Sequence, residues 1–419
     1  MFDLTSLGIK AKTASAVISA LSEKERASVL RVAATALRNN AQFLIKENAF
    51  DIETAKTKGM SDAFIDRLTL SEKVIEGMAV GLEQVADLKS PLGEIVYSHE
   101  NVEQGISIIK KTVPFGVVGI IYESRPNVTA DAFALCFKTA NAVILKGGSD
   151  SLRSNMAIVK VIKGALNECG VDENAVSVIE DTSRETTTAF MRMNKYVDLL
   201  IPRGSASLIK AAVENSTIPI IETGTGNCHV YVDEFADTDM AAQVIFNAKT
   251  QRYSVCNACE SLVVHSKILA VALPKIANEL VKKQVEIRAD ERAYMAIKDY
   301  PYLQKATDED FYTEYGSAII SVKTVDDIDQ AIEHINEHGT KHSESIITAC
   351  ADRAEKFLNE VDASSVYHNA STRFTDGFVF GLGAEIGIST QKLHARGPMG
   401  LSALVTTKYV IKGDGAVRK

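Results

Sequence analysis

The sequence lacks several features that would each indicate a particular class of protein. It contains no run of about 18 uninterrupted apolar residues, so no membrane-spanning helix is expected. Its start lacks the basic segment, the apolar segment and the small-residue cleavage site of a secretory signal. The 46 Lys and Arg do not exceed the 54 Asp and Glu, and the net charge of −8 argues against nucleic-acid binding. Six scattered cysteines do not suggest a disulfide framework, and they predict a reducing, cytoplasmic location.

Two cysteines, Cys256 and Cys259, stand three positions apart in "TQRYSVCNACES" (250–261). A zinc site would need a second pair or histidines at ligand spacing, and only the isolated His229 and His265 are near, so no metal is predicted. The pair also lies deep in a long chain, unlike a thioredoxin-like redox motif. Burial in the core stays open for either cysteine, because a thiol packs as a small hydrophobe.

The residues around Cys256 favour a single nucleophile with an uninvolved neighbour. The flanking segment "NAKTQRYSVCNA" is polar, and it places Lys249 and Arg252 where positive charge would favour a thiolate. The segment also falls at a predicted domain junction, and ligand sites favour such junctions and the carboxyl ends of strands.

The glycine fingerprint G-x-G-x-x-G of a standard Rossmann domain is also absent after the early strands. In its place, three predicted strands end in turns rich in small residues: Lys146-Gly147-Gly148-Ser149, Arg203-Gly204-Ser205 and Glu222-Thr223-Gly224-Thr225-Gly226. Such turns offer backbone N–H groups and a capping hydroxyl to a phosphate. Their repetition at successive strand ends predicts a nucleotide site.

The order of apolar patterns predicts an α/β protein with two domains. Apolar residues at three- and four-residue steps predict helices over 13–90, and from residue 116 short apolar runs such as "GVVGIIYE", "NAVILKGG" and "IPIIET" alternate with helical stretches. A second series begins near residue 261, so each domain should contain a parallel sheet. We expect a nucleotide-binding domain over 1–255, with a helical part over 1–95 and a β arm at about 96–113. A catalytic domain should follow over 256–400, and a C-terminal β hairpin over 401–419 should act as an oligomerisation arm.

Several segments together resemble the aldehyde dehydrogenase superfamily: "VPFGVVGIIYESRPNVT" (113–129), "ANAVILKGGSDS" (140–151) and "NAKTQRYSVCNA" (247–258). Within that superfamily the chain is similar to the γ-glutamyl phosphate reductase family, also called glutamate-5-semialdehyde dehydrogenases. The narrower resemblance rests on "VENSTIPIIETGTGNCHVYVD" (213–233), "VDDIDQAIEHINEHGTKHSESI" (325–346) and "KLHARGPMGLSAL" (392–404). It implies an aldehyde-dehydrogenase-like fold and NADPH-dependent reduction of γ-glutamyl phosphate through a cysteine thioester, the second step from glutamate to proline.

The resemblance also implies residue roles. Cys256 corresponds to the nucleophile, Asn127 is a candidate oxyanion donor, and Cys259 has no counterpart role. The implied cofactor-binding residues, for NADPH or NADP, are Lys146, Gly147, Ser149, Gly204, Ser205, Glu222, Gly224 and Glu314. The implied substrate-binding residues are Arg125, Arg252, His338 and Arg373.

Two departures from the family pattern accompany the resemblance: Tyr253 stands in place of a proline, and Ser205 in place of a second glycine. A hydrolytic NAD(P) aldehyde dehydrogenase and a non-enzymatic thiol-switch protein remain as alternative functions. The expected substrate is γ-glutamyl phosphate. The expected protein partners are glutamate 5-kinase, in a transient contact, and other copies of the chain in a dimer or tetramer.

Overall fold

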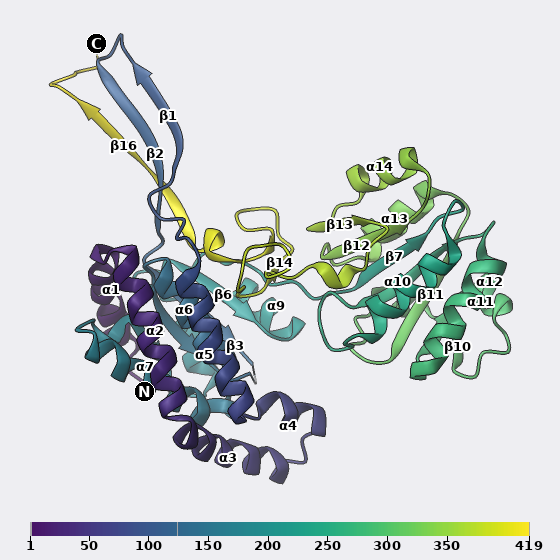
Figure 1. The fold of residues 1–419 in the computed structure, drawn as a ribbon, viewed down its shortest axis with the longest axis horizontal. Helices are drawn as coiled ribbons and strands as arrows, with labels where there is room; N and C mark the ends of the chain where they lie inside the picture. The colour runs from purple at the N-terminus through teal and green to yellow at the C-terminus, as the bar shows by residue number, and fades with distance from the viewer. Residues whose placement is uncertain (1, 124, 419) are drawn as a thin grey trace. The chain divides into compact units, whose positions relative to one another are not determined.

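The computed structural model describes residues 2–123 and 125–418, and the chain forms two compact units (Figure 1). The first unit comprises Met1–Thr223, Gly381–Gly387 and Met399–Lys419, and the second comprises Gly224–Phe380 and Ile388–Pro398. Each unit contains a parallel sheet with helices, which confirms the predicted α/β fold class. The division at Thr223/Gly224 differs from the predicted boundary near residue 255, because the segment "CHVYV" is a strand of the second sheet and the helix after it packs into the core of the same unit.

The helical start of the first unit contains five α-helices. They are α1 (Leu4–Ala20), α2 (Glu23–Asn39), α3 (Ala41–Thr57), α4 (Asp62–Leu68) and α5 (Glu72–Asp87). Four of them begin at a side-chain cap, namely Asp3, Ser22, Ser61 and Ser71. Such a side chain accepts a hydrogen bond from an otherwise unpaired N–H of the first turn, which stabilises the helix start.

The sheet of the first unit has four parallel strands in the order β5-β4-β3-β6. They are β3 (Val117–Tyr122), β4 (Ala142–Lys146), β5 (Val176–Val178) and β6 (Leu199–Arg203), connected by α6 (Asn127–Lys138), α7 (Leu152–Glu168) and α8 (Arg184–Phe190), with α9 (Ala206–Asn215) after β6. The predicted strand "IPIIET" is reduced to one bridge between Leu200 and Ile220. Pro219 carries no N–H to donate to a ladder, which limits pairing there.

Three antiparallel strands form an arm that belongs to the first unit, in the order β1-β2-β16 (Figure 1). They are β1 (Ile95–Asn101), β2 (Ile106–Pro114) and β16 (Val405–Gly413). The predicted C-terminal hairpin is therefore a single strand. Its register runs from Val405 opposite Pro114 to Gly413 opposite Ile106, and the Gly-Asp-Gly turn comes only at its end.

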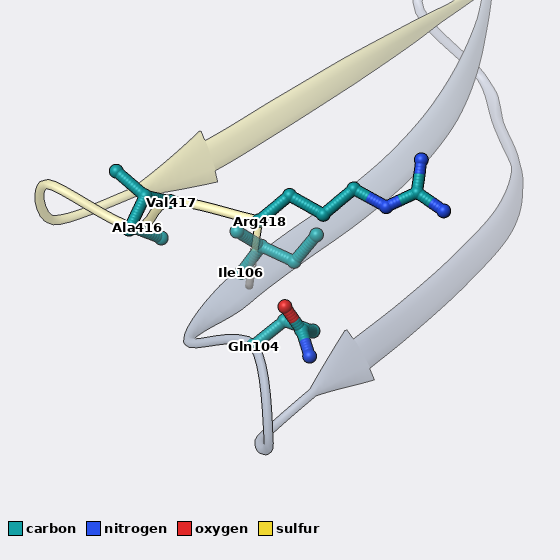
Figure 2. A pocket seen from close by; sticks show the side chains of 5 residues that line it. All are labelled: Gln104, Ile106, Ala416, Val417 and Arg418. Atoms are coloured by element: carbon teal, nitrogen blue, oxygen red, sulfur yellow. The ribbon is translucent and has the colours of Figure 1, made fainter.

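A hollow of about 380 Å³ lies at the tip of this arm, lined by Gln104, Ile106, Ala416, Val417 and Arg418 (Figure 2). None of the predicted site residues lines it.

The sheet of the second unit has seven parallel strands in the order β10-β9-β11-β8-β7-β12-β13. They are β7 (Cys228–Val232), β8 (Cys259–His265), β9 (Glu286–Ala289), β10 (Leu303–Lys305), β11 (Ile319–Val325), β12 (Ser343–Ile347) and β13 (Ser365–His368). Successive residues of β7 pack into different cores. Val230 and Val232 join a cluster with α10 (Thr238–Thr250) and α11 (Leu269–Leu280), whereas Tyr231 joins one with α13 (Ile328–His338) and α14 (Ala351–Glu360).

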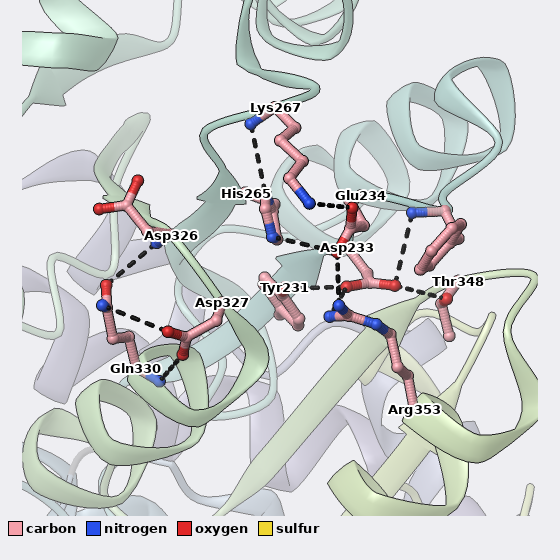
Figure 3. A network of polar contacts seen from close by, with 11 residues as sticks. Tyr231, Asp233, Glu234, His265, Lys267, Asp326, Asp327, Gln330, Thr348 and Arg353 are labelled. Atoms are coloured by element: carbon pink, nitrogen blue, oxygen red, sulfur yellow. Dashed lines mark hydrogen bonds and ion pairs between the residues drawn. The ribbon is translucent and has the colours of Figure 1, made fainter.

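At the carboxyl edge of this sheet, the buried Asp233 accepts hydrogen bonds from Tyr231, Thr348 and Arg353 (Figure 3). The segment that carries Cys256 precedes β8 and so lies at the amino edge of its own sheet, not at the carboxyl edge. Over 2–123 and 125–418, no helix is long and apolar enough to cross a membrane.

Candidate active site

Cys256 lies half-buried in the loop between α10 and β8, and the segment before β7 packs directly against its backbone. The Cys228 Sγ–H donates to the Cys256 carbonyl at 3.1 Å. A Cβ built on Gly226 would lie 1.5 Å from that carbonyl oxygen, so only glycine allows this approach. The main chain of Cys256 is therefore held from one side by residues 226–228.

Asn257 holds the loop from another side. Its Nδ2 donates to the Thr375 carbonyl at 2.9 Å, and its own carbonyl accepts from Thr372 Oγ1 at 2.7 Å. These bonds attach the residue after Cys256 to the segment that carries Arg373.

One predicted substrate arginine, Arg373, lies near the thiol, and a second, Arg252, lies near Arg373. Burial lowers the pKa of Arg373, negative charge on Cys256 opposes that shift, and the nearby Arg252 adds to the lowering. Arg373 Nε also donates to Gln251 Oε1 at 2.9 Å, which fixes the guanidinium beside the loop. Positive charge at this point favours a thiolate and an anionic substrate.

Cys259 and Lys249, the other two residues singled out in this segment, are both buried. Cys259 is the first residue of β8, and burial raises the pKa of its thiol to about 12, which disfavours the thiol-switch alternative. The Lys249 ammonium is fully buried and pairs with Glu260. It therefore does not provide the positive charge beside Cys256 that the sequence suggested. The six cysteines all lie within the described residues, and none is in a disulfide.

Glu314, in a loop, and His338, at the end of α13, both contact the turn before β7. The Glu314 carboxylate accepts a hydrogen bond from the Gly226 N–H. Burial of the carboxylate raises the pKa of Glu314, and this hydrogen bond opposes the shift. The residue as a whole is exposed to solvent. His338 ends α13, and its ring packs 4.1 Å from that of His334. Its carbonyl accepts from Asn227 Nδ2 at 2.9 Å, so His338 reaches the turn through its backbone.

The segment 325–346 builds a buried polar cluster beneath the loop. His342 Nδ1 lies 2.8 Å from Ser343 Oγ, which lies 2.6 Å from Thr375 Oγ1. Glu344 Oε2 lies 3.0 Å from His229 Nδ1. Over the described ranges, no group of three or more His, Cys, Asp or Glu could hold a metal ion.

The first unit carries Lys146, Gly147 and Ser149 at the end of β4. Lys146 is buried, its ammonium donates to the Gly147 carbonyl at 3.2 Å, and burial lowers its pKa while Asp181 opposes the shift. A Cβ on Gly147 would lie 2.2 Å from Asn155 Nδ2, so the turn is closed to a side chain. Ser149 begins the short helix that follows.

Gly204 and Ser205 form the start of α9, where a carboxylate is already bound. Ser205 donates from its N–H to Glu123 Oε2 at 2.8 Å and from its Oγ to Glu123 Oε1 at 3.0 Å. A Cβ on Gly204 would lie 2.6 Å from the same carboxylate. This helix start thus donates hydrogen bonds to two anionic oxygens, as it would to those of a phosphate.

Asn127 and Arg125 lie where α6 begins. Asn127 Nδ2 donates to Asp131 Oδ2 at 3.3 Å, and the Arg125 carbonyl accepts from Val128 N–H at 3.1 Å. Burial raises the pKa of Asp131 to about 6, while Arg203 and Asn127 oppose the shift.

The remaining two candidates, Glu222 and Gly224, flank the division of the chain into two units. Glu222 is half-buried, and the Gly224 N–H donates to the Ile388 carbonyl at 2.9 Å.

The second unit therefore brings together Cys256, Arg252, Arg373 and the turn that Glu314 contacts. The first unit holds the predicted cofactor residues at the ends of β4 and β6. Sequence reasoning missed Glu123, Asn227, Cys228, Glu260 and Thr375, although all but Glu260 and Thr375 lie in segments quoted for the family resemblance.

A profile of the aldehyde dehydrogenase family matches residues 5–297 and 305–408, and the chain belongs to that family. The relatives carry a more specific name. A gamma-glutamyl phosphate reductase of Lachnospira eligens is 55% identical over 419 residues, and one of Caldicellulosiruptor bescii is 52% identical over 420, each match covering 100% of both chains. The crystal structure of a gamma-glutamyl phosphate reductase from Thermotoga maritima superposes with a TM-score of 0.96 at 45% identity, again over 100% of both chains. The resemblance found in the sequence is confirmed.

Proposed function

We propose that the chain reduces γ-glutamyl phosphate to glutamate-5-semialdehyde and phosphate with NADPH, the second step from glutamate to proline. The observation that carries the proposal is the fixed backbone of Cys256 beside Arg373 and Arg252, in a chain 55% identical to a relative of that name. A carboxylate resists hydride at neutral pH, whereas an acyl phosphate has a good leaving group.

Cys256 is the nucleophile in this mechanism. Its thiolate attacks the γ-carbonyl carbon, the carbon–sulfur bond forms, and phosphate leaves with the electrons of the broken carbon–oxygen bond. The resulting thioester is the species that is reduced, and collapse of the second tetrahedral intermediate releases the aldehyde and regenerates the thiolate. The Cys256 N–H and Asn127 Nδ2 are the proposed donors to the oxyanion.

Cationic side chains are the proposed substrate ligands. Arg373 lies close enough to Cys256 to interact with its charge, and Arg252 lies close to Arg373. Both arginines would neutralise the phosphate or the α-carboxylate. Arg125 and His338 complete the proposed set.

Most of the predicted cofactor residues lie in the first unit, and their chemistry fits a dinucleotide. At the start of α9, the Ser205 N–H and hydroxyl already donate to the two carboxylate oxygens of Glu123, and Lys146 is a buried cation at the end of β4. Ser205 and Gly204 would hold the pyrophosphate, Lys146, Gly147 and Ser149 the adenosine ribose and its 2′-phosphate, and Glu314 the nicotinamide ribose, with Glu222 and Gly224 in the same set. The bound nicotinamide would supply the hydride.

The arm supports a further part of the proposal, that the chain forms a dimer or tetramer. Its outer strands β1 and β16 carry exposed Ile95, Tyr97 and Ile411, and both leave unpaired edges. We place the enzyme in the cytoplasm, where a reducing environment preserves the thiolate. Transient contact with glutamate 5-kinase would shorten the lifetime of the unstable acyl phosphate in solution.

The test runs the reaction in reverse, with glutamate-5-semialdehyde, NADP and inorganic phosphate, and follows the absorbance of reduced nicotinamide. We expect reduction of NADP that requires phosphate and is abolished by Cys256→Ala. Reduction that proceeds without phosphate would instead indicate a hydrolytic aldehyde dehydrogenase.

A further inference from the structure

Lys249 and Glu260 form a buried ion pair at the two ends of the loop that carries Cys256. The Lys249 ammonium lies 2.5 Å from Glu260 Oε2, and neither side chain has exposed surface. Lys249 is in the last turn of α10, and Glu260 is the second residue of β8. Burying two charges removes their hydration, so such a pair adds little net stability over apolar residues of similar size. Stability alone therefore does not account for it.

The second oxygen of Glu260 reaches a third segment. Oε1 accepts from Gly316 N–H at 3.3 Å, and Gly316 follows Glu314 by two residues. The Glu314 carboxylate accepts from Gly226 N–H, and Gly226 packs against the Cys256 backbone. Glu260 thus connects the two ends of the loop to the segment before β11. That segment in turn contacts Gly226 through Glu314, and Gly226 packs against the Cys256 backbone.

We propose that Lys249 and Glu260 are positioning residues that hold the loop 251–258 in the conformation in which Cys256 reacts. This inference rests on the proposed function of Cys256. Neither side chain is exposed, so both act through the loop backbone rather than on the substrate.

The cation that interacts with the Cys256 thiol is Arg373, because Lys249 is paired with Glu260. A loosened loop would weaken that interaction and misplace the sulfur. Both the thiolate fraction and the turnover number would then fall.

The test measures alkylation of Cys256 by iodoacetamide in the full chain over a range of pH, with the Cys256 peptide quantified by mass spectrometry. The kcat and KM of the reverse reaction and the Tm are measured beside it. Lys249→Met leaves the carboxylate unpaired, whereas the double variant Lys249→Met/Glu260→Met replaces the pair by apolar side chains and leaves no buried charge.

In both variants we expect the pH midpoint of Cys256 alkylation to rise by about 1 unit, because the opposite charge is less well placed. We expect kcat to fall about 10- to 100-fold, the effect of a nucleophile displaced by about 1 Å. KM for the semialdehyde should stay within about threefold. The Tm should fall in Lys249→Met and recover in the double variant.

A matched control lies at the opposite edge of the same sheet (Figure 3). The fully buried Asp233 pairs with Arg353 at 2.9 Å, so Arg353→Met also leaves a buried carboxylate without its cation. This variant should lower the Tm and leave both the alkylation midpoint and kcat unchanged.

The proposal is overturned if the double variant regains the wild-type Tm together with the wild-type kcat and alkylation midpoint, since the pair would then be structural alone. If the double variant does not fold, Glu260→Gln decides, because it keeps the volume and one acceptor oxygen. A lowered Tm with unchanged kcat and midpoint in that variant also overturns the proposal. Alkylation needs no substrate, so a wild-type chain without reductase activity whose variants still shift the midpoint would contradict the proposed function and support the positioning role.

Discussion

Gly226→Ala should remove most of the turnover, because the added methyl group meets the backbone of Cys256, the proposed nucleophile. It would lie 1.5 Å from the Cys256 carbonyl oxygen, 2.2 Å from its carbonyl carbon and 2.5 Å from its Cα. An ordinary contact needs about 3.5 Å, so the two backbone segments must move apart by roughly 2 Å. A shift of about 1 Å in a reacting group can cost a factor of 10². We therefore expect kcat to fall at least about 100-fold, equivalent to about 2.7 kcal/mol in barrier.

The same turn offers a comparison at Gly224. A Cβ there would lie 2.2 Å from Thr390 Cγ2, 2.8 Å from its Oγ1 and 3.1 Å from its Cβ, so it meets a side chain and not the backbone of Cys256. Gly224→Ala should therefore stay within about tenfold of wild type, because Thr390 can shift. Gly164→Ala in α7 serves as the folding control, since nothing lies within 4 Å of its added methyl group. The reverse reaction and thermal unfolding are measured on all three variants. A Gly226→Ala variant within about threefold of wild-type kcat would refute the claim that this turn fixes Cys256.

Four further outcomes are expected. Cys259→Ala should retain most of the activity that Cys256→Ala abolishes, since burial raises the pKa of Cys259 to about 12 and keeps it a thiol; equal losses in turnover assays would indicate a paired-cysteine mechanism. Lys146→Ala should lose the preference for NADPH over NADH, a change of about 1–3 kcal/mol when the two kcat/KM values are compared. A wild type that prefers NADH would contradict the assignment of Lys146 to the 2′-phosphate. Glu222→Gln should leave phosphate-dependent reversal within about tenfold, because phosphate needs no general base; a loss of about 10²–10⁴-fold, with reduction in the absence of phosphate, would favour hydrolysis. Deletion of 401–419 removes β16 from the arm and should lower the mass measured by light scattering, whereas an unchanged mass would show that the arm does not mediate assembly.

The strands that could be predicted most directly from the sequence are those that are buried along their whole length. "GVVGIIYE" and "NAVILKGG" are apolar almost throughout, and both form strands that are buried along their whole length. "IPIIET" has the same composition but carries Pro219, and it pairs at one position only. The tail 405–413 alternates as a hairpin strand would, and its partner turned out to be β2. Periodicity reports which residues are buried, but it does not report which strand lies alongside.

The site shows the same limit. Cys256 could be proposed as the nucleophile from the sequence, because its neighbours form a recognisable motif. Glu260 and Glu123 could not, because their roles depend on partners that folding brings near. Glu123 meets Ser205 across 82 positions, and Glu260 meets Gly316 across 56. A lone carboxylate in the sequence is most often a solvated side chain.

The pairing of β16 with β2 has a consequence for synthesis of the chain. From Pro114 to Val405 the ribosome must add about 290 residues, which takes roughly 15–60 s at typical rates. During that interval one edge of β2 has no partner, although the parallel sheets of both units can already be complete. An unpaired edge in a nascent chain is a template for pairing with other chains. The arm is thus completed only after the strands of both parallel sheets have been made, and the emergence of β16 ends the period in which β2 is open to incorrect partners.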